Sequence, residues 1–556
     1  GEGVRSILEK QIGELSREIS RGVGVSERKI QAARPSAPDV PTSSMEAYNS
    51  FLKGKDAYEK FYYEQARQFL ENAVALDADF AEAYLYLART QTSLGNQKAR
   101  IEAYEKAKVL SGKAAEKERF YIEAAYAGAI ERDPEKRLRI LEEIVQKYPK
   151  EKEAHFELAS YYRGLNKLEL AISEFDKALA LDPNYGYALN VIAYTYADLG
   201  NYDKAINYLK RYAESSPGDA NPIDSMAEIY FRMGNLDEAI AKYKEVLDRK
   251  PGFVLSLPSL AYVYAFKEDY TNAMSCVVEF IAKAPSLGLK GQGSFIHSLF
   301  LYCLGRFNQA LSDLQQLADL AGSQGYTEGK AGTELLMGLI RGERGEFEQS
   351  RTLLKSWYDF TSKSDPASFS DSKAYYLFFL GMTDVKQGRL DAAKTSLAEM
   401  KALLAKISPA NQAQFAFVYD CFQGEFFLAG GFVDNAVSVL ENIVPQAKPS
   451  AMRQDVLFIY NIPFQKDILA RAYVKRGDID KAIAEYERLI TFDPKREQRT
   501  LIHPLYHYRL AKLYDQKGEK TKAAEQYQKF LAIWKDADPD RPEAADAKKR
   551  LAGLKD

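Results

Sequence analysis

The chain has 556 residues, of which 46% are hydrophobic and 28% charged, and its 76 basic and 78 acidic side chains leave a formal net charge of −2. This length exceeds that of one ordinary globular domain, so several domains or an array of repeats are expected. The balanced charge argues against a surface for nucleic acid. We expect no membrane span, because the sequence contains no run of about 18 apolar residues.

Residues 1–30 are predicted to form an amphipathic helical arm. Apolar residues recur there at intervals of three and four, which places them on one face of a helix. These residues are Leu8, Ile12, Leu15 and Ile19. An isolated stripe of this kind must be covered by another surface, so we expect the arm to serve in self-association. Residues 31–44 carry prolines and no apolar period, which is typical of a linker.

A period of 34 residues runs through the region that follows the linker. Alanine recurs at this spacing in two phases, tyrosine in a third and proline in a fourth. The residues are Ala159, Ala193, Ala227 and Ala261; Ala171, Ala205, Ala239 and Ala273; Tyr162, Tyr196, Tyr230 and Tyr264; and Pro149, Pro183, Pro217, Pro251 and Pro285. Small residues at two fixed phases predict a repeated helix–turn–helix unit whose helices cross closely, and proline ends each unit. Regular units are therefore expected over residues 45–285.

The spacing of the small residues lengthens after Pro285. The markers in the second helices are Ala310, Ser350, Ala393, Ala436, Ala482 and Ala523. Residues 286–534 are therefore predicted to form longer units, and residues 535–556 a polar capping helix. The whole pattern predicts an all-α solenoid of about 12–13 helical pairs.

The phases of residues 152–285 resemble the tetratricopeptide repeat, which implies a right-handed superhelix that binds proteins in its concave groove. The segments EISRGVGVSERKI and YHYRLAKLYDQKGEKTKAAEQYQKFLAIWKDADPDRPEAADAKKRLAGL resemble parts of bacterial TolB-like multidomain regulators. In those proteins a kinase or cyclase domain often precedes the repeats. The sequence holds no glycine-rich phosphate loop and no His-Arg-Asp motif, so the resemblance covers the non-catalytic part.

Catalytic and metal chemistry find little support in the residues. Two patterns are candidate metal sites: His503 with His507, and Asp536 with Asp538 and Asp540. Pro504 pushes the first histidine out of helical geometry, and the aspartates lack the glycine and glutamate of a calcium loop. The three cysteines, Cys276, Cys303 and Cys421, lie in apolar stretches typical of buried thiols. We expect no enzyme, no cofactor and no metal.

The resemblance also predicts which first-helix residues face the groove. They are Asn190, Tyr194, Asp224, Glu228, Phe231, Arg232, Tyr262 and Phe266. This set mixes aromatic rings, an amide and carboxylates, and it lacks the paired lysines and asparagines that grip a C-terminal carboxylate. We therefore expect a partner segment with apolar and basic side chains, unless the rings merely pack against neighbouring helices.

Two functions remain open from the sequence. The first is self-association into a homo-oligomer, in its boldest form a head-to-tail extracellular or surface filament, because the ends of an open solenoid are complementary. The alternative is a scaffold or sensor module of a bacterial signalling protein that binds a peptide partner. The chain starts with Gly1 rather than methionine, which suggests a processed product. An extracytoplasmic or extracellular location is favoured, with the cytoplasm as the alternative.

Overall fold

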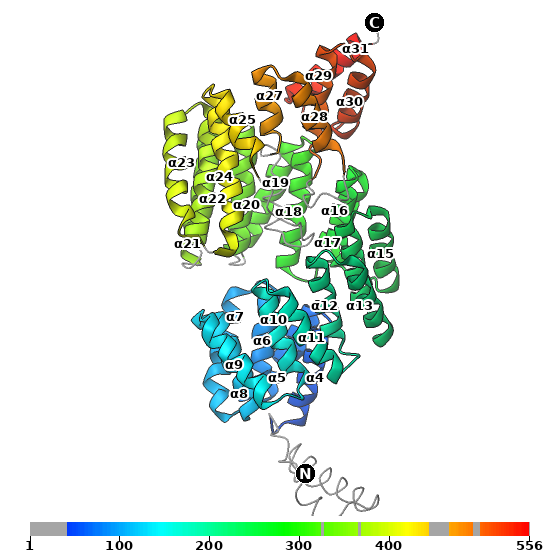
Figure 1. Ribbon diagram of the computed structural model, residues 1–556, viewed down its shortest axis with the longest axis vertical. Helices are drawn as coiled ribbons and strands as arrows, with labels where there is room; N and C mark the ends of the chain where they lie inside the picture. The colour runs from blue at the N-terminus through cyan, green and yellow to red at the C-terminus, as the bar shows by residue number, and fades with distance from the viewer. Residues whose placement is uncertain are drawn as a thin grey trace, which may run out of the picture. The chain divides into compact units, whose positions relative to one another are not determined.

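The structure, a computed structural model, describes residues 42–323, 327–364, 369–407, 409–443, 466–492 and 501–554. Within these ranges the chain is helical and has no strand, as Figure 1 shows. Taken two by two along the described chain, the helices from α4 to α30 make thirteen pairs, and α31 follows them. The prediction of an all-α repeat superhelix is confirmed. The arm predicted over residues 1–30 lies outside the described residues.

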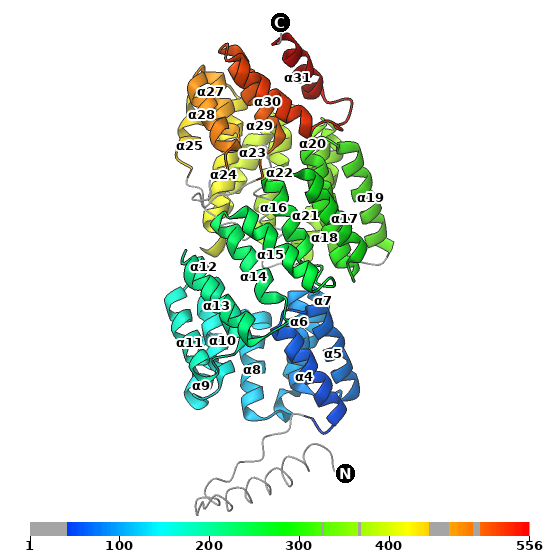
Figure 2. The same ribbon diagram turned by 90° about the vertical axis from the view of Figure 1, so that its right-hand side faces the viewer.

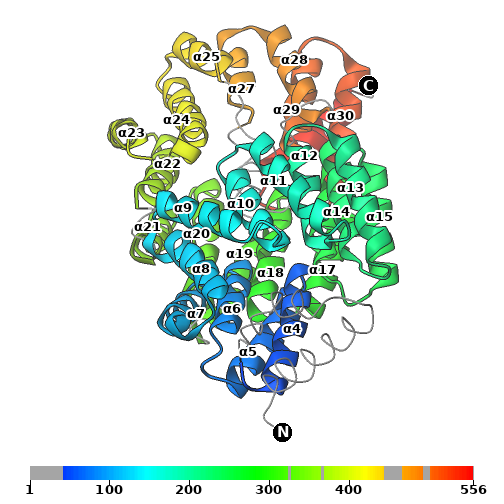
Figure 3. The ribbon, with the colours of Figure 1, turned by 60° about the horizontal axis from the view of Figure 1, so that its bottom comes forward.

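The chain divides into two compact units. Unit 1 ends at Ile229 and unit 2 starts at Tyr230, so the division falls within α14 (Asn221–Met233). The other helices of unit 1 are α4 (Met45–Glu59), α5 (Tyr63–Leu76), α6 (Ala81–Ser93), α7 (Gln97–Leu110), α8 (Glu116–Tyr126), α9 (Pro134–Lys147), α10 (Lys152–Gly164), α11 (Leu168–Leu181), α12 (Gly186–Asp198) and α13 (Tyr202–Ser215). They follow one another round a curve (Figure 3).

Unit 2 contains longer helices. Its helices after α14 are α15 (Leu236–Arg249), α16 (Ser256–Phe266), α17 (Tyr270–Lys283), α18 (Leu287–Cys303), α19 (Phe307–Ser323), α20 (Thr327–Glu343), α21 (Phe347–Ser364), α22 (Phe369–Gln387), α23 (Leu390–Leu404), α24 (Pro409–Ala429), α25 (Val433–Glu441), α27 (Ile468–Arg476), α28 (Ile479–Ile490), α29 (Pro504–Gln516), α30 (Lys520–Ile533) and α31 (Pro542–Gly553). Helices α18 to α24 have 15 to 21 residues, whereas α10 to α13 have 13 or 14. The helices after Pro285 are thus longer as far as α24, whereas α25 and α27 to α30 have 9 to 14 residues.

Small residues lie where the helices of each pair cross. The second-helix markers are completely buried: Ala171, Ala205, Ala239, Ala273, Ala310, Ser350, Ala393, Ala436, Ala482 and Ala523 each have 0% exposure. The same constraint explains glycine in the first helices of unit 2. A Cβ atom on Gly424 of α24 would lie 2.7 Å from Cδ2 of Leu440 in its partner helix α25, closer than real Cβ contacts come. The periodic small residues in the sequence therefore mark the positions where the two helices of a pair pack closely.

A residue with left-handed backbone conformation ends the first helix in many of the described pairs. Glycine fills this place at Gly95 and Gly200, with φ of 75° and 76°, because it adopts positive φ without a steric penalty. Phe61 and Glu268 occupy equivalent turns, with φ of 65° and 60°. A side chain costs about 1–2 kcal/mol in this conformation, so a compensating contact is expected at both residues.

In unit 1 the turn after α4 contacts the fifth helical pair. The ring of Phe61 lies 5.2 Å from the ring of Tyr187 in α12, and the ring of Tyr58 lies 5.9 Å from it. The hydroxyl of Tyr62 donates a hydrogen bond of 2.6 Å to Asp219, which is 157 residues away in sequence. These contacts close unit 1 on itself and offset the backbone strain at Phe61.

Unit 2 closes through its last helices. Nε2 of His507 in α29 lies 2.7 Å from Oε1 of Glu268, the turn residue between α16 and α17. The indole N–H of Trp534 donates to the carbonyl of Cys303 at the end of α18, over 2.9 Å. Helix α31 packs beside α30 at the C-terminal end of the array (Figure 2). Each unit thus has a turn residue other than glycine at its closing contact.

Replacing Ala205 by tryptophan should strongly destabilise the chain, because the buried crossing between α12 and α13 has no room for an indole. Overpacking of this kind costs about 1–3 kcal/mol and occasionally more. Asn207→Trp is the matched control, because Asn207 is exposed on the same helix. Thermal denaturation followed by circular dichroism measures both variants. Equal melting temperatures for Ala205→Trp and Asn207→Trp would contradict the close packing of α12 and α13 at Ala205.

Substitutions at two turn glycines can distinguish the energetic cost of backbone strain from that of disturbing the closing contact of unit 2. Gly305 has φ of 72°, and a Cβ there would lie 3.1 Å from Trp534 and from Ala537. Gly345 has φ of 79° with no atom within 4 Å of the added Cβ. Gly345→Ala should cost about 1–2 kcal/mol from backbone strain alone. Gly305→Ala should cost more in urea denaturation, because its methyl group also presses on the closing helices. Equal losses would show that this contact does not form.

Candidate functional site

Aromatic and acidic side chains fill the inner face of unit 1. The rings of Phe156 in α10 and Tyr187 in α12 are 4.5 Å apart. The guanidinium group of Arg89 in α6 pairs with Glu157 at 2.9 Å. Burial raises the pKa of Glu82 to about 7, and nearby lysines and Arg89 only partly oppose the shift. Side chains of unit 1 therefore contact one another across this inner face and occupy its space.

Four of the predicted groove residues lie in unit 1. The hydroxyl of Tyr194 donates a hydrogen bond of 3.0 Å to Glu228, so the structure brings these two together. Asn190 is 2% exposed, and its Oδ1 accepts no hydrogen bond from the described residues. Asp224 is half-buried on α14. Contact between these residues and a partner segment stays a prediction.

The other four predicted residues lie in unit 2, where three of them are rings inside the packing. Phe231 and Phe266 are 1% and 3% exposed, and their ring centroids are 5.2 Å apart. Tyr262 is 3% exposed and lies 5.5 Å from the ring of Phe300. Arg232 is half-buried. The rings thus contact neighbouring helices, which is the alternative that the sequence left open for them.

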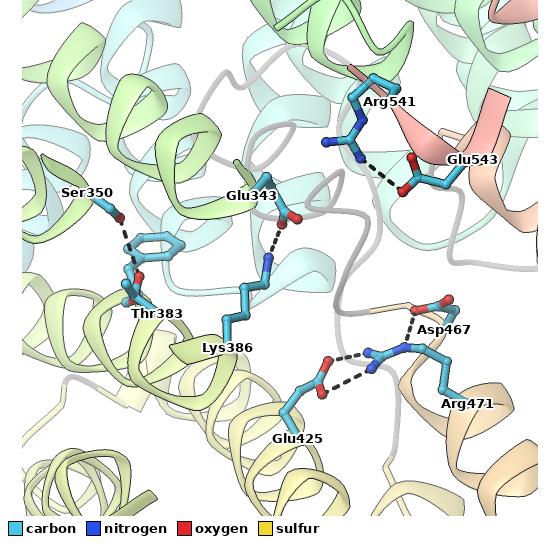
Figure 4. A network of polar contacts seen from close by, with 10 residues as sticks. Glu343, Ser350, Thr383, Lys386, Glu425, Asp467, Arg471, Arg541 and Glu543 are labelled. Carbon is cyan, nitrogen blue, oxygen red and sulfur yellow. Dashed lines mark hydrogen bonds and ion pairs between the residues drawn. The ribbon is translucent and has the colours of Figure 1, made fainter. Parts of the chain in front are cut away.

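Ion pairs join successive first helices of unit 2 (Figure 4). Glu343 of α20 pairs with Lys386 of α22. Further along, Arg471 of α27 donates from both terminal nitrogens to Glu425 of α24, one of them over 3.2 Å, and from Nε to Asp467 over 3.0 Å. These side chains therefore form a polar ladder across helices that lie one repeat apart.

The ladder ends at a cleft of about 570 Å³ near the C-terminus, called the C-terminal cleft below. Helices α27, α28, α29 and α31 supply its lining. The lining residues are Arg471, Val474, Tyr486, Arg509, Lys512, Leu513, Asp515, Gln516 and Arg550. Four of these nine side chains are cationic and only one is anionic, so the lining is predominantly cationic.

A buried carboxylate holds the arginines of the cleft in place. Asp467 is 0% exposed and accepts hydrogen bonds from Arg471, Arg509 and the hydroxyl of Tyr486. Burial by itself would raise the pKa of Asp467, but the charges of Arg509 and Arg471 outweigh burial and lower the pKa. Asp467 therefore stays ionised and fixes two guanidinium groups at the cleft wall.

The sequence interpretation missed the C-terminal cleft, although a signal was present. Arg471 and Lys512 each follow the small residue of a first helix, Ala470 and Ala511. That is the phase of Glu228, which follows Ala227 and was assigned to the groove. Applying the same phase to the last two pairs would have placed two cations on the inner face.

The residues considered as metal ligands have structural roles in unit 2. His503 caps the start of α29, where its Nδ1 accepts from the backbone N–H of Leu505 over 3.2 Å. Burial lowers the pKa of His503 to about 3, so it remains neutral. The carboxylate of Asp538 accepts from the backbone N–H of Asn308 over 2.9 Å. In the described part of the chain, no three His, Cys, Asp or Glu side chains are placed to hold a metal ion.

Two of the three cysteines are buried thiols, as the sequence predicts. Cys303 and Cys421 are 1% and 2% exposed, whereas Cys276 is half-buried. Burial raises the pKa of Cys303 and of Cys421 to about 12. Of the helices that the structure describes, none combines the length and apolar character needed to cross a bilayer.

The stacked helical pairs and their small-residue crossings define an all-α repeat solenoid. A family model described as tetratricopeptide repeat matches residues 123–186, 156–220 and 469–542, and a second model with the same description matches residues 196–257. The chain is therefore a tetratricopeptide-repeat protein, as its alanine and tyrosine phases predicted. Proteins of this fold are in general non-catalytic scaffolds for protein interaction.

Individual proteins show more limited similarity. The transcription activator GutR of Bacillus subtilis (strain 168) is 29% identical over 149 residues, which are 27% of this chain and 16% of GutR. MamA from Desulfovibrio magneticus RS-1, residues 41 to the end, is 20% identical with a TM-score of 0.27, over 31% of this chain and 99% of that chain. A thermophilic TPR protein of Thermus thermophilus is 22% identical with a TM-score of 0.25, over 41% and 99%. These TM-scores carry no inference about partners or assembly.

The closing contact of unit 2 should respond to acid. Burial raises the pKa of Glu268, but its bonds to His507 and Lys529 outweigh burial and lower the pKa below its ordinary value of 4.5. A lowered carboxyl pKa adds stability above 4.5 that is lost as the pH falls through the folded-state pKa. Glu268→Gln should therefore cost about 1–3 kcal/mol at pH 7, and this loss should shrink below pH 4.5.

Urea denaturation at several pH values measures this difference. The exposed Glu348 of α21 provides the control variant, Glu348→Gln. A loss for Glu268→Gln that stays constant down to acid pH would show that Glu268 is not ionised in the closing contact.

Proposed function

We propose that the chain is a non-enzymatic scaffold that binds a segment of a partner protein in the C-terminal cleft of unit 2. The cleft itself is the observation that carries this proposal. Its volume of about 570 Å³ lies within the range of about 300–1,000 Å³ that is usual for ligand sites. Its wall combines two aliphatic side chains, Val474 and Leu513, and the ring of Tyr486 with six charged or amide side chains that can orient a ligand.

The repeat geometry supports binding of an extended segment. Eight of the nine lining side chains come from α27, α29 and α31, which are alternate helices along the array, and Tyr486 comes from α28. A segment lying across these helices would contact each of them in turn, as occurs on the concave surfaces of repeat proteins. The ion pairs of Arg471 and Arg509 with Asp467 preorganise the wall, which reduces the entropy lost on binding.

The residues of the cleft favour binding over catalysis. The nine lining residues include no serine, cysteine or histidine. The cations are arginines and one lysine, and the only lining carboxylate, Asp515, pairs with Arg550 at 3.3 Å. Neither a nucleophile with its base nor a poised proton donor can be assembled from this set.

Filling the cleft should abolish binding. Val474 is 38% exposed on the cleft wall, so Val474→Trp places an indole in the cleft without disturbing the core. Val278→Trp on α17 is the control, because Val278 is 53% exposed and does not line the cleft. Both variants and the parent protein are applied to an array of random peptides of about ten residues. We expect the peptides that bind the parent to lose at least about tenfold in affinity for Val474→Trp alone. Unchanged binding by Val474→Trp would place the function elsewhere.

Self-association through the arm is a separate prediction. Leu8, Ile12, Leu15 and Ile19 lie outside the described residues, so the filament and the homo-oligomer rest on the sequence pattern. Burial of these four side chains would contribute several kcal/mol, at about 1.5–3 kcal/mol each. Deleting residues 1–40 should leave a fully helical monomer by light scattering and circular dichroism. An unchanged assembly after the deletion, or a monomeric intact chain at high concentration, would refute this role of the arm.

A further inference from the structure

At Arg471 and Arg509 the C-terminal cleft presents positive charge while the compensating carboxylates are buried behind it. Arg550 instead pairs with Asp515 and Asp546, whose side chains are 28% and 34% exposed. The side chains of Arg471, Arg509 and Arg550 have exposures of 29%, 35% and 38%. The carboxylate groups of Asp467 and Glu425, which neutralise the first two, have exposures of 0% and 9%. A ligand in the cleft therefore meets guanidinium groups first. Coulombic attraction to a negative ligand is strongest where water is partly excluded, as in a cleft.

The arginines of the cleft keep N–H groups that can donate hydrogen bonds to a ligand. Arg509 donates from Nη1 to Asp467. Arg550 donates from Nε to Asp546 and from Nη1 to Asp515, and its Nη2 can donate to a further acceptor. A guanidinium group has five N–H bonds in a planar fork that matches the two oxygens of a carboxylate, so one such group can serve a fixed partner and a ligand together.

Lys512 adds an ammonium group with no ion pair closer than 4.0 Å to a described carboxylate. It is exposed on α29, and its Nζ lies 5.4 Å from the centre of the Tyr508 ring. Because Lys512 follows Ala511, it has the same repeat phase as Arg471 after Ala470. The two cations therefore belong to one row on the inner face of the last two pairs.

The other lining groups favour a peptide over a polyphosphate chain. Val474 and Leu513 are apolar and would contact hydrophobic side chains, whereas a nucleic-acid backbone offers charge at every step. Asp515 also lines the cleft and would repel a phosphate placed beside it. A peptide that alternates carboxylate and apolar side chains satisfies both features, because its carboxylates can meet the arginines while its apolar groups meet Val474 and Leu513.

We infer that the C-terminal cleft selects an acidic segment of a partner protein, with carboxylates on Arg509, Lys512 and Arg550 and apolar side chains on Val474 and Leu513. This inference rests on the proposed function and identifies the chemistry of the segment. It reverses the expectation from the predicted groove, which was for a basic segment, because the cleft lies in the last pairs rather than in the pairs around α12 to α16.

The test compares two labelled peptides of about ten residues, one alternating glutamate with leucine and the other glutamine with leucine. Fluorescence anisotropy with the full chain should show at least about tenfold tighter binding of the glutamate peptide at low salt. This preference should fall as the salt concentration rises, because the exposed cations are screened. Equal affinity for the two peptides would overturn the inference.

Charge reversal identifies the site. Lys512→Glu should weaken binding of the glutamate peptide by about tenfold or more and leave the glutamine peptide nearly unaffected. Lys520→Glu is the matched control: Lys520 is exposed at the start of α30, does not line the cleft, and undergoes the same change of charge. An equal loss for both variants would overturn the inference, because it would indicate only the overall charge of the chain. Circular dichroism confirms that both variants are folded.

Two further outcomes separate the inference from the proposed function. If neither peptide binds, the acidic selection is wrong, whereas the scaffold proposal fails only if the peptide array also finds no binder that Val474→Trp removes. An unstructured oligothymidylate that binds more tightly than the glutamate peptide, and loses that binding in Lys512→Glu, would overturn the inference in favour of nucleic acid.

Discussion

The close crossing of two helices at a small residue is the constraint on which the rest of the structure depends. Ala205 of α13 is completely buried at its crossing, and a methyl group on Gly424 of α24 would overlap the side chain of Leu440 in α25. Once the distance between helices is set, the side chains next to the small residue can only point to the inner face or into the next repeat. The crossing therefore determines both the stacking of the array and the phase of its inner surface.

Contacts between distant repeats hold each unit together in addition to the contacts between neighbouring repeats. An open solenoid has contacts only between neighbouring repeats, and its ends are free to fray. Phe61 in unit 1 and Glu268 in unit 2 accept a backbone conformation that glycine would adopt more easily. Their side chains gain contacts with residues 126 and 239 positions further along the chain, Tyr187 and His507 respectively. Local strain is thus offset by long-range packing, and the two units use different chemistry for it, rings in one and charge in the other.

The inner faces of the two units are filled differently. In unit 1, aromatic rings such as Phe156 and Tyr187 and the Arg89–Glu157 ion pair occupy the interior. In unit 2, the buried Asp467 fixes arginines at the wall of an open cleft. A buried ion pair adds little net stability because of desolvation, but it holds the guanidinium groups in one geometry. Positioning is therefore the contribution of this network, and it suits recognition better than stability.

The sequence by itself determined the helices, the pairing and the crossings, because these depend on side chains within one repeat and recur with a period of 34 residues. Its groove assignment stays a prediction, although Tyr194 and Glu228 from that set do contact each other. It could not show that Phe231 and Tyr262 are covered, or that Arg509 and Arg550 line one cleft. Tertiary structure decided these points, because the curvature of the array accumulates over many repeats. Small rotations between neighbouring pairs add up along the array and determine which distant side chains meet. This total rotation cannot be read from the sequence of a single repeat.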